Sequence, residues 1–542
     1  MENSALVRPA TVRWTPWQVQ AGWLLRAHRL CHADPSSRQL PEFAAAYRDG
    51  HRGAAGTSPS SLSRWETGRV PVGQEAVRRY EDVLGLPAYS LLAPIQTIAR
   101  HEGGATAAVF LRGGACPSMS GSVETGIEPL LDRALDGGVL TGEDWDELTL
   151  WATYGGGRVS PGRVRSAVVR RLLEETLVSG GVSWMRRFES LGRLMADPRW
   201  GPEVIAVCSG AAEQPGHAGL IETVCALDGS PHPDAARAVL RQLTDPTTPD
   251  CLYGALLAGA RKTRKRHFSA EQTRVLVDVV DGILAGGPGQ ALSLPAVEAA
   301  AVLLPGLPLS PAHAARLAGA AADHGETVRA IVRHGSLVGP ESAAISVTRL
   351  LARLSVDVPV QIAPVLRDLL DDLLHHPVAD VRLYAAMLLR ASPYGSEVAT
   401  ALAAELRQPS TVRAEDRAVP LLYALRVLGG PGQRDVVAGL TLAQGLPSGV
   451  VVAAVHALGH VGGRSPESYW RAVFAQHTRA TATDAAEQHS VMKRLVYGFA
   501  MAGELPLFTR LVEEQDRAAP AQHLSEWWTG LAPHISDSAR HG

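Results

Sequence analysis

Apolar residues recur along this chain at intervals of three and four, the spacing that gathers side chains on one face of an α-helix. No stretch shows a convincing two-residue alternation of apolar and polar residues, so we predict an all-α protein without strands. The first strong pattern predicts an amphipathic helix that ends near Leu30. Its apolar stripe consists of Trp17, Ala21, Leu24, Leu25 and His28.

Two shorter helices are predicted further along. One runs from Pro41 to Arg48, and the other runs from Gln74 to Leu84 and is closed by Gly85 and Pro87. Their expected inner faces comprise Phe43, Ala44 and Tyr47 in the first helix, and Val77, Tyr80, Val83 and Leu84 in the second.

The segment between these helices contains the most specific local pattern of the chain. Ser58 is a good helix N-cap, and Pro59 occupies the first helical position, where its missing N–H costs nothing. Leu62 and Trp65 are three residues apart and share a face that can be buried. Gly68 ends the helix where left-handed backbone is favoured.

The remaining faces of this short helix carry Ser60, Ser63 and Arg64. Small side chains let a helix approach base pairs closely, and arginine can hydrogen-bond guanine in the major groove. The pattern therefore favours DNA recognition. The alternative is a buried helical hairpin with no role in nucleic-acid binding.

The run from Ser58 to Arg69 resembles phage-repressor-type (Cro/Xre) helix-turn-helix domains, and the resemblance covers roughly the first ninety residues. It implies that Glu66 braces the end of the recognition helix. The resemblance implies that bases are read by Pro59, Ser60 and Arg64, with Ser63 beside them. It implies that phosphates are contacted by Ser58, Thr67, Arg69 and Gln74, with Arg52 from the preceding loop. The implied core positions of the recognition helix are Leu62 and Trp65.

Two connections are longer than the family pattern. Asp49 to Thr57 forms a nine-residue loop in place of a tight turn, and the link from Leu30 to Pro41 is long and polar. Three explanations remain open. The insertions are tolerated surface loops, they add DNA-backbone contacts through Arg48, His51 and Arg52, or they loosen the domain until DNA orders it.

Charge is distributed unevenly along the chain. The net charge is −2, but residues 1–100 contain twelve arginines against eight acidic residues, a net of +4 that leaves −6 for the remainder. The basic end coincides with the helix-turn-helix pattern, as steering toward phosphate favours. Because this surplus is small, we expect affinity to depend on charge placement and on dimerisation.

The 542 residues are 46% apolar, which allows several domains with large cores. No run of about eighteen apolar residues occurs, and residues 1–14 lack the apolar segment of a secretory signal. The five cysteines form no CxxC pair, which favours free thiols in a reducing cytoplasm. We therefore expect a cytoplasmic, nucleoid-associated protein without a membrane span.

The sequence divides into three predicted parts. Residues 1–92 form the DNA-binding domain in this interpretation. Residues 93–126 are rich in Gly, Ala, Ser and Pro and are predicted as a linker, with at most a helix around Ile95 to Arg100. Residues 127–542 form a long helical region.

Internal similarity appears within the helical region. Met387, Ala424 and Ala457 occupy corresponding positions in recurring motifs, thirty-seven and thirty-three residues apart. The motifs resemble HEAT or armadillo-type helical repeats, most clearly from about Pro359 to Gly463. The resemblance implies an α-solenoid whose concave face dimerises, senses an effector, or binds a peptide, protein or small molecule.

The densest charge run lies near the middle of the chain. It could grip the phosphate of DNA or of a nucleotide as a secondary basic patch. The favoured interpretation is a solvated loop between helices or the end of a helix, where cations complement the C-terminus. The run consists of Arg261, Lys262, Arg264, Lys265 and Arg266.

Motifs for catalysis or for metal binding are not found. The acidic run from Gly142 to Glu147 is explained by Thr141 capping a helix with an acidic first turn. Gly155 to Gly157 are not followed by a P-loop, and no HExxH or Gly-x-Ser-x-Gly pattern occurs. We therefore predict no catalytic residue, no metal and no cofactor.

These observations predict a sequence-specific transcriptional regulator that binds double-stranded DNA as a homodimer on a pseudopalindromic operator. The alternative is an interaction scaffold whose N-terminal helices bind a protein instead of DNA. A third possibility is a helical-repeat DNA-repair enzyme, which no motif favours.

Overall fold

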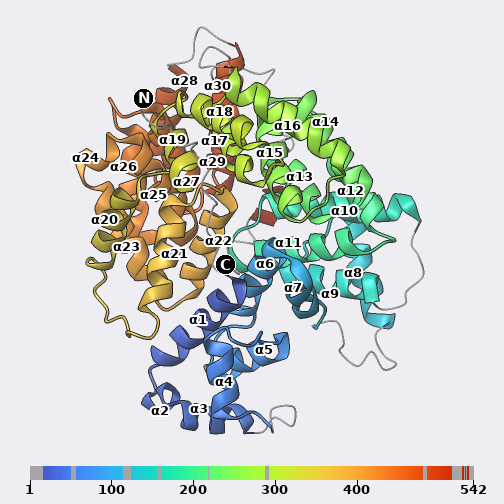
Figure 1. Cartoon of the computed structure of the whole chain (residues 1–542), viewed down its shortest axis with the longest axis vertical. Coiled ribbons are helices and arrows are strands. Elements are labelled where there is room, and N and C mark those ends of the chain that lie inside the picture. Colours follow the sequence, from blue (N-terminus) through green and yellow to red (C-terminus); the bar gives the residue numbers. More distant parts are fainter. Residues whose placement is uncertain are drawn as a thin grey trace.

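The computed structural model describes residues 16–49, 56–113, 124–154, 161–215, 217, 219–286, 292–479, 485–514, 528–529, 531–532 and 534–535. Over these residues the chain forms helices and no strand, which confirms the predicted all-α class (Figure 1). Within the same residues, no helix is both long and apolar enough to cross a bilayer.

The N-terminal unit, residues 16–113, begins with the helices that the sequence predicts. The predicted end at Leu30 and the starts at Pro59 and Gln74 are confirmed. Its first five helices are α1 (Trp17–Leu30), α2 (Pro35–Arg38), α3 (Leu40–Arg48), α4 (Pro59–Glu66) and α5 (Gln74–Val83).

The helix expected around Ile95 to Arg100 is present as α6 (Leu92–Glu102), and it is followed by α7 (Gly104–Arg112), which was not expected. The prediction of a linker is wrong for these residues, because both helices contribute buried side chains to the core. Almost every residue of α6 is buried, because the helix packs against α1, α7, α11 and α22. The buried carboxylate of Glu81 starts α6 by accepting hydrogen bonds from the backbone N–H groups of Leu91 and Leu92 at 2.7 and 2.9 Å.

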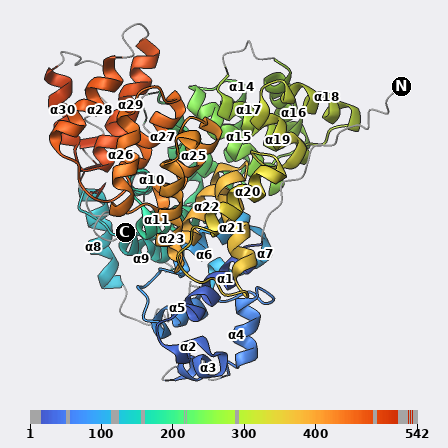
Figure 2. The ribbon, with the colours of Figure 1, turned by 90° about the vertical axis from the view of Figure 1, so that its left-hand side faces the viewer.

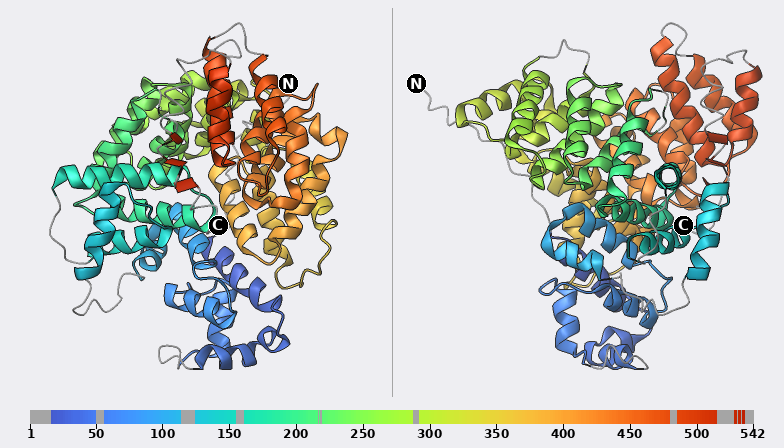
Figure 3. Two further views of the ribbon diagram at one scale, coloured as in Figure 1. Left: turned by 180° about the vertical axis from the view of Figure 1, so that it is seen from behind. Right: turned by 90° about the vertical axis from the view of Figure 1, so that its right-hand side faces the viewer.

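The rest of the chain forms two stacks of helices, which we call the first and the second arm. They lie on opposite sides of the molecule (Figure 3). The first arm comprises α8 (Glu124–Asp136), α9 (Gly142–Tyr154), α10 (Gly162–Leu177), α11 (Gly181–Ala196), α12 (Gly201–Ala212), α13 (Leu220–Ala226), α14 (Pro233–Thr244), α15 (Pro249–Arg264), α16 (Ala270–Ala285), α17 (Leu294–Leu303), α18 (Pro311–Ala322) and α19 (Glu326–His334). The second arm comprises α20 (Pro340–Leu351), α21 (Ala363–His375), α22 (Ala379–Ala391), α23 (Gly395–Leu406), α24 (Pro409–Val412), α25 (Glu415–Leu428), α26 (Arg434–Leu442), α27 (Ser448–Leu458), α28 (Glu467–Arg479), α29 (Ala485–Met501) and α30 (Leu505–Glu514).

Each arm consists of an inner and an outer layer. In the first arm α13, α15, α17 and α19 pack in succession, with α14, α16 and α18 behind them. In the second arm α22, α25, α27 and α29 pack in succession, with α21, α23, α26 and α28 behind them. The inner layers of both arms line one central cavity of about 2270 Å³.

The core of the N-terminal unit is continuous with that of the second arm. Its buried apolar residues belong to one cluster with those of the second arm, whereas most of the first arm forms a separate cluster. Trp23 of α1 is almost fully buried and donates its indole N–H to the carbonyl of Ile362 at 3.2 Å. The sulfur of Cys31 lies 3.1 Å from the Tyr394 hydroxyl. The N-terminal unit is therefore docked on the second arm.

Helix α6 joins all three parts. Arg100 forms a two-pronged ion pair with Glu189 of α11, with both N···O distances 2.6 Å. The ring of His101 packs against Tyr384 of α22, 4.7 Å between centroids. Glu102 accepts a hydrogen bond from the Trp17 backbone N–H of α1 at 2.7 Å. Movement of one arm relative to the other would therefore move α6 and the helices that it supports.

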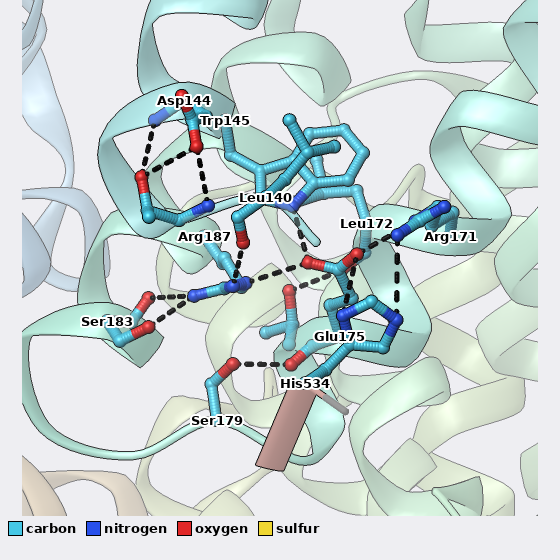
Figure 4. Close-up of polar contacts among 12 residues, drawn as sticks. Leu140, Asp144, Trp145, Arg171, Leu172, Glu175, Ser179, Ser183, Arg187 and His534 are labelled. Carbon is cyan, nitrogen blue, oxygen red and sulfur yellow. Dashed lines mark hydrogen bonds and ion pairs between the residues drawn. The ribbon is translucent and has the colours of Figure 1, made fainter. Parts of the chain in front are cut away.

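The C-terminal turns return to the first arm at the buried carboxylate of Glu175 in α10. This group accepts hydrogen bonds from the Trp145 indole at 2.6 Å and from the Arg171 and Arg187 guanidiniums at 2.8 and 3.2 Å (Figure 4). His534 reaches the same carboxylate, with Nδ1 3.5 Å from Oε1. His534 therefore ties the C-terminal region to the first arm.

Candidate nucleic-acid interface

The start and end of α4 are formed as the sequence predicts. The Ser58 hydroxyl accepts a hydrogen bond from the Ser61 backbone N–H at 3.2 Å, and Pro59 is the first helical residue. Gly68 has a φ of +67°, and a Cβ there would lie 2.8 Å from the Val19 Cα of α1. Both the turn and the contact between α1 and α4 therefore require glycine.

The inner side of α4 is fixed by packing and by a buried ion pair. Leu62 is fully buried, as predicted, whereas Trp65 is only half-buried and lies beside Tyr47 with ring centroids 6.1 Å apart. Glu66 pairs with Arg29 of α1 and also accepts the Tyr80 hydroxyl at 3.1 Å. Burial and the adjacent Glu66 raise the pKa of Tyr80 well above its usual value.

The outer side of α4 is open. Ser60, Arg64, Thr67 and Arg69 are exposed, and Ser58, Pro59 and Ser63 are half-buried. The side chains of Arg64 and Arg69 make no ion pair or hydrogen bond with any residue that the structure describes. Together with α2 and α3, α4 forms the end of the molecule opposite the arms (Figure 1 and Figure 2).

The ends of the long loop before α4 are held in place. Arg48 donates to the Thr57 carbonyl at 3.0 Å, across the loop. Arg79 of α5 donates to the carbonyls of Tyr47 and Asp49 at 2.9 and 2.6 Å and so caps the C-terminus of α3. The middle of the loop, with Arg52, lies outside the described residues. No local pattern in the sequence predicts the bracing by Arg29 and Arg79, because the groups that they contact lie far from them along the chain.

The expected phosphate contact of Gln74 is wrong. Gln74 is buried, and its amide donates to the carbonyls of Phe110 and Leu111 at 2.8 and 3.2 Å. Its amide oxygen accepts a hydrogen bond from Gln96 of α6 at 3.2 Å. All of these partners lie within residues 93–126, which were predicted as a linker. The prediction for Gln74 is therefore wrong for the same reason as the prediction of a linker.

The predicted basic patch does not form an open phosphate site. Arg261 is buried and pairs with Asp228 at 3.0 Å and with Asp380 of the second arm at 3.4 Å. Lys262 is fully buried and donates to the Ser230 carbonyl at 2.7 Å. Burial lowers the pKa of Lys262 to about 8 although the nearby Asp228 opposes this shift.

The other members of this run lie at the cavity. Lys265 lies 3.9 Å from Asp228, and Arg264 donates to the His101 carbonyl of α6 at 2.7 Å. Arg266 is exposed with a φ of +58°, just after the end of α15. The interpretation as a helix end is confirmed, since α15 ends at Arg264. The buried members Arg261 and Lys262 hold α15 to its neighbours, whereas Arg264 and Arg266 are exposed.

The acidic run at the start of α9 is a helix cap, as predicted. The Thr141 hydroxyl accepts the Asp144 backbone N–H at 3.1 Å. Asp146 pairs with Arg186 and Arg193 of α11 at 2.6 and 2.7 Å, all three being buried. Within the residues that the structure describes, no group of three or more His, Cys, Asp or Glu side chains is arranged to hold a metal ion.

The four cysteines among the described residues are free thiols: Cys31, Cys208, Cys225 and Cys251 form no disulfide. Burial raises the pKa of Cys208 and of Cys225 to about 12, so neither thiol is activated as a nucleophile.

Comparison with protein-family models, with curated proteins and with solved structures finds no match to this chain.

Proposed function

We propose that this protein is a sequence-specific DNA-binding regulator in which α3 and α4 form a helix-turn-helix and α4 lies in the major groove. The observation that carries the proposal is the contrast between the two sides of α4. Its inner side is locked by Leu62 and Glu66, whereas Ser60 and Arg64 face solvent without partners among the described residues. A rigid helix with a free arginine on its outer face suits direct readout of guanine.

Access to α4 supports the same proposal. The helix lies at the end of the molecule that is farthest from the arms, so a duplex can approach it (Figure 2). Arg69, just beyond the helix, is exposed and can contact a neighbouring phosphate. The alternative of a buried hairpin would require these side chains to pack against the rest of the protein.

The arms are proposed to be HEAT-like repeats that sense an effector or join two subunits. The three sequence motifs fall at Met387 on α22, Ala424 on α25 and Ala457 on α27, which pack in succession in one layer. Such stacking of helix pairs is how helical repeats bury their apolar faces. In a homodimer, two copies of α4 would read half-sites one helical turn apart.

The test is DNA binding by the full-length protein. Binding to genomic fragments is measured at several salt concentrations for the wild-type protein, for Arg64→Ala and for Arg237→Ala. Arg237 is a matched control, since it is an exposed arginine on α14 whose ion pair is with Asp234 of the same helix. We expect affinity to fall steeply with salt, and we expect Arg64→Ala to weaken specific binding by about 1–3 kcal/mol with no change for Arg237→Ala.

Two outcomes would reject the proposal. One is the absence of a preferred fragment at any salt concentration, which would favour the scaffold alternative. The other is an equal effect of both arginine substitutions, which would remove α4 as the reading element.

A further inference from the structure

The wall of the central cavity in the second arm carries a compact group of cationic and aromatic side chains. They come from four helices of the inner layer and all line the cavity. We call them the cavity cluster: Arg390 of α22, Arg426 of α25, His456 and His460 of α27, and Tyr497 of α29.

Hydrogen bonds hold the centre of the cluster in place. The Tyr497 hydroxyl accepts a hydrogen bond from Arg426 at 2.9 Å and lies 2.5 Å from Nε2 of His460. The His456 ring packs edge-on against Tyr497, 5.4 Å between centroids. Arg390 is fastened at one nitrogen by the Val427 carbonyl at 2.6 Å. The two guanidiniums are therefore positioned before any ligand arrives.

The two guanidiniums of this cluster lack a close ion-pair partner among the described residues. No carboxylate of the described residues lies within ion-pair distance of Arg390 or Arg426. Glu222 faces the cluster from α13 across the cavity and attracts Arg426, which opposes the rise in the pKa of that carboxyl caused by burial. Arg390 is exposed and Arg426 is half-buried, so an anion that enters the cavity can reach both guanidiniums and pair with them.

An aromatic surface adjoins the two arginines. Tyr423 lies one turn before Arg426 on α25, so the two side chains share a face. Tyr423 lines the cavity, and 41% of its surface is exposed. An exposed ring beside fixed guanidiniums offers stacking and charge together, the combination by which proteins hold a base and its phosphates.

We propose that this wall of the cavity binds a nucleotide, with its phosphates on Arg390 and Arg426 and its base on Tyr423. The cavity, at about 2270 Å³, is larger than typical small-molecule pockets of roughly 300–1,000 Å³, so such a ligand fits without displacing the wall. The inference deepens the proposed function by naming the effector class, and any regulatory consequence rests on that function. Binding itself is measured without DNA, so either proposal can fail alone.

The experiment is titration calorimetry on the full chain, with four ribonucleoside diphosphates, adenosine and pyrophosphate as separate probes. We expect at least one diphosphate to bind with a Kd below ~1 mM, more tightly than pyrophosphate, with adenosine weakest. Arg426→Gln and Tyr423→Ala should each weaken that diphosphate about tenfold. Arg329→Gln, on the exposed side of α19, is the control and should change nothing.

Tyr423→Ala keeps the test valid if Arg426→Gln does not fold, because the exposed ring makes no described hydrogen bond. Its expected signature is selective: the diphosphate weakens and pyrophosphate does not. Binding of no diphosphate, binding of pyrophosphate alone, or diphosphate binding unaffected by either variant would each overturn the nucleotide assignment.

Discussion

The carboxylate of Glu66 on α4 accepts two hydrogen bonds from the guanidinium of Arg29 on α1, at 2.6 and 2.7 Å. Both side chains are buried, and the remaining nitrogen of Arg29 donates to the Arg38 carbonyl. This pair joins three helices at the point where α4 ends. The orientation of the exposed face of α4 therefore depends on a contact on its opposite side.

Glu66→Gln should destabilise the protein strongly, because it leaves the Arg29 charge buried without its partner. The expected loss in the free energy of unfolding is about 3–5 kcal/mol, measured by urea denaturation. Glu326→Gln breaks an exposed pair with Arg329 and should cost less than about 1 kcal/mol. Equal losses for the two variants would show that the Glu66 pair is not the brace described here.

Gly22→Ala tests the close approach of α1 and α4. A Cβ at Gly22 would lie 2.4 Å from the Trp65 carbonyl oxygen, so the helices must separate. We expect a loss of roughly 1–3 kcal/mol in unfolding free energy. The control is Gly282→Ala in α16, where a Cβ meets nothing within 4 Å and should stabilise by about 0.5–1 kcal/mol. A neutral Gly22→Ala variant would contradict the contact.

The histidines of the cavity cluster predict acid sensitivity. Burial, together with Arg426 and Arg494, lowers the pKa of His456 to about 4. In the unfolded chain the pKa of His456 is about 6.5. Between pH 4 and pH 6.5, His456 is therefore protonated in the unfolded state and neutral in the native state. The contribution of His456 to stability is thus complete above about pH 6.5 and is lost as pH falls toward 4.

The measurement is the free energy of unfolding at pH 7 and pH 5 for the wild-type protein and for His456→Gln. The wild-type protein should lose more stability between these values, by about 1–2 kcal/mol. Subtracting the loss of the variant from that of the wild-type protein removes the contribution of other titrating groups. One such group is Asp372: burial raises its pKa to about 7, so its effect on stability has the opposite sign to that of His456. Parallel losses in the two proteins would show that His456 is not held neutral.

The ends of α4 could be predicted from the sequence, because they depend on residues that are close together along the chain. Ser58, Pro59 and Gly68 define α4 through capping and backbone preference, which depend on neighbours in sequence. The same reasoning failed for Gln74, because its partners Phe110 and Gln96 lie in a stretch whose glycines and alanines resemble a linker. Small residues favour loops in isolation, but packing against α1, α7, α11 and α22 buries α6.

The hydrophobic pattern of the sequence also does not predict the buried charged residues of α11. Helix α11 buries Arg186, Arg187, Glu189 and Arg193, positions that an amphipathic pattern would assign to solvent. They are buried because partners from other helices, such as Asp146 and Glu175, meet them. The cavity cluster was missed for the same reason, since its members are brought together only by the stacking of four helices.

The most direct test of the central claim is to compare how Arg64→Ala and Arg69→Ala change sequence preference, using selection of bound sites from a random DNA library. In the proposed complex, Arg64 reads a base and Arg69 contacts a phosphate. We predict that Arg64→Ala relaxes the preference at one position of the site, whereas Arg69→Ala lowers affinity for all sequences alike and keeps the preference. An unchanged site preference for Arg64→Ala would contradict the assignment of α4 as the recognition helix.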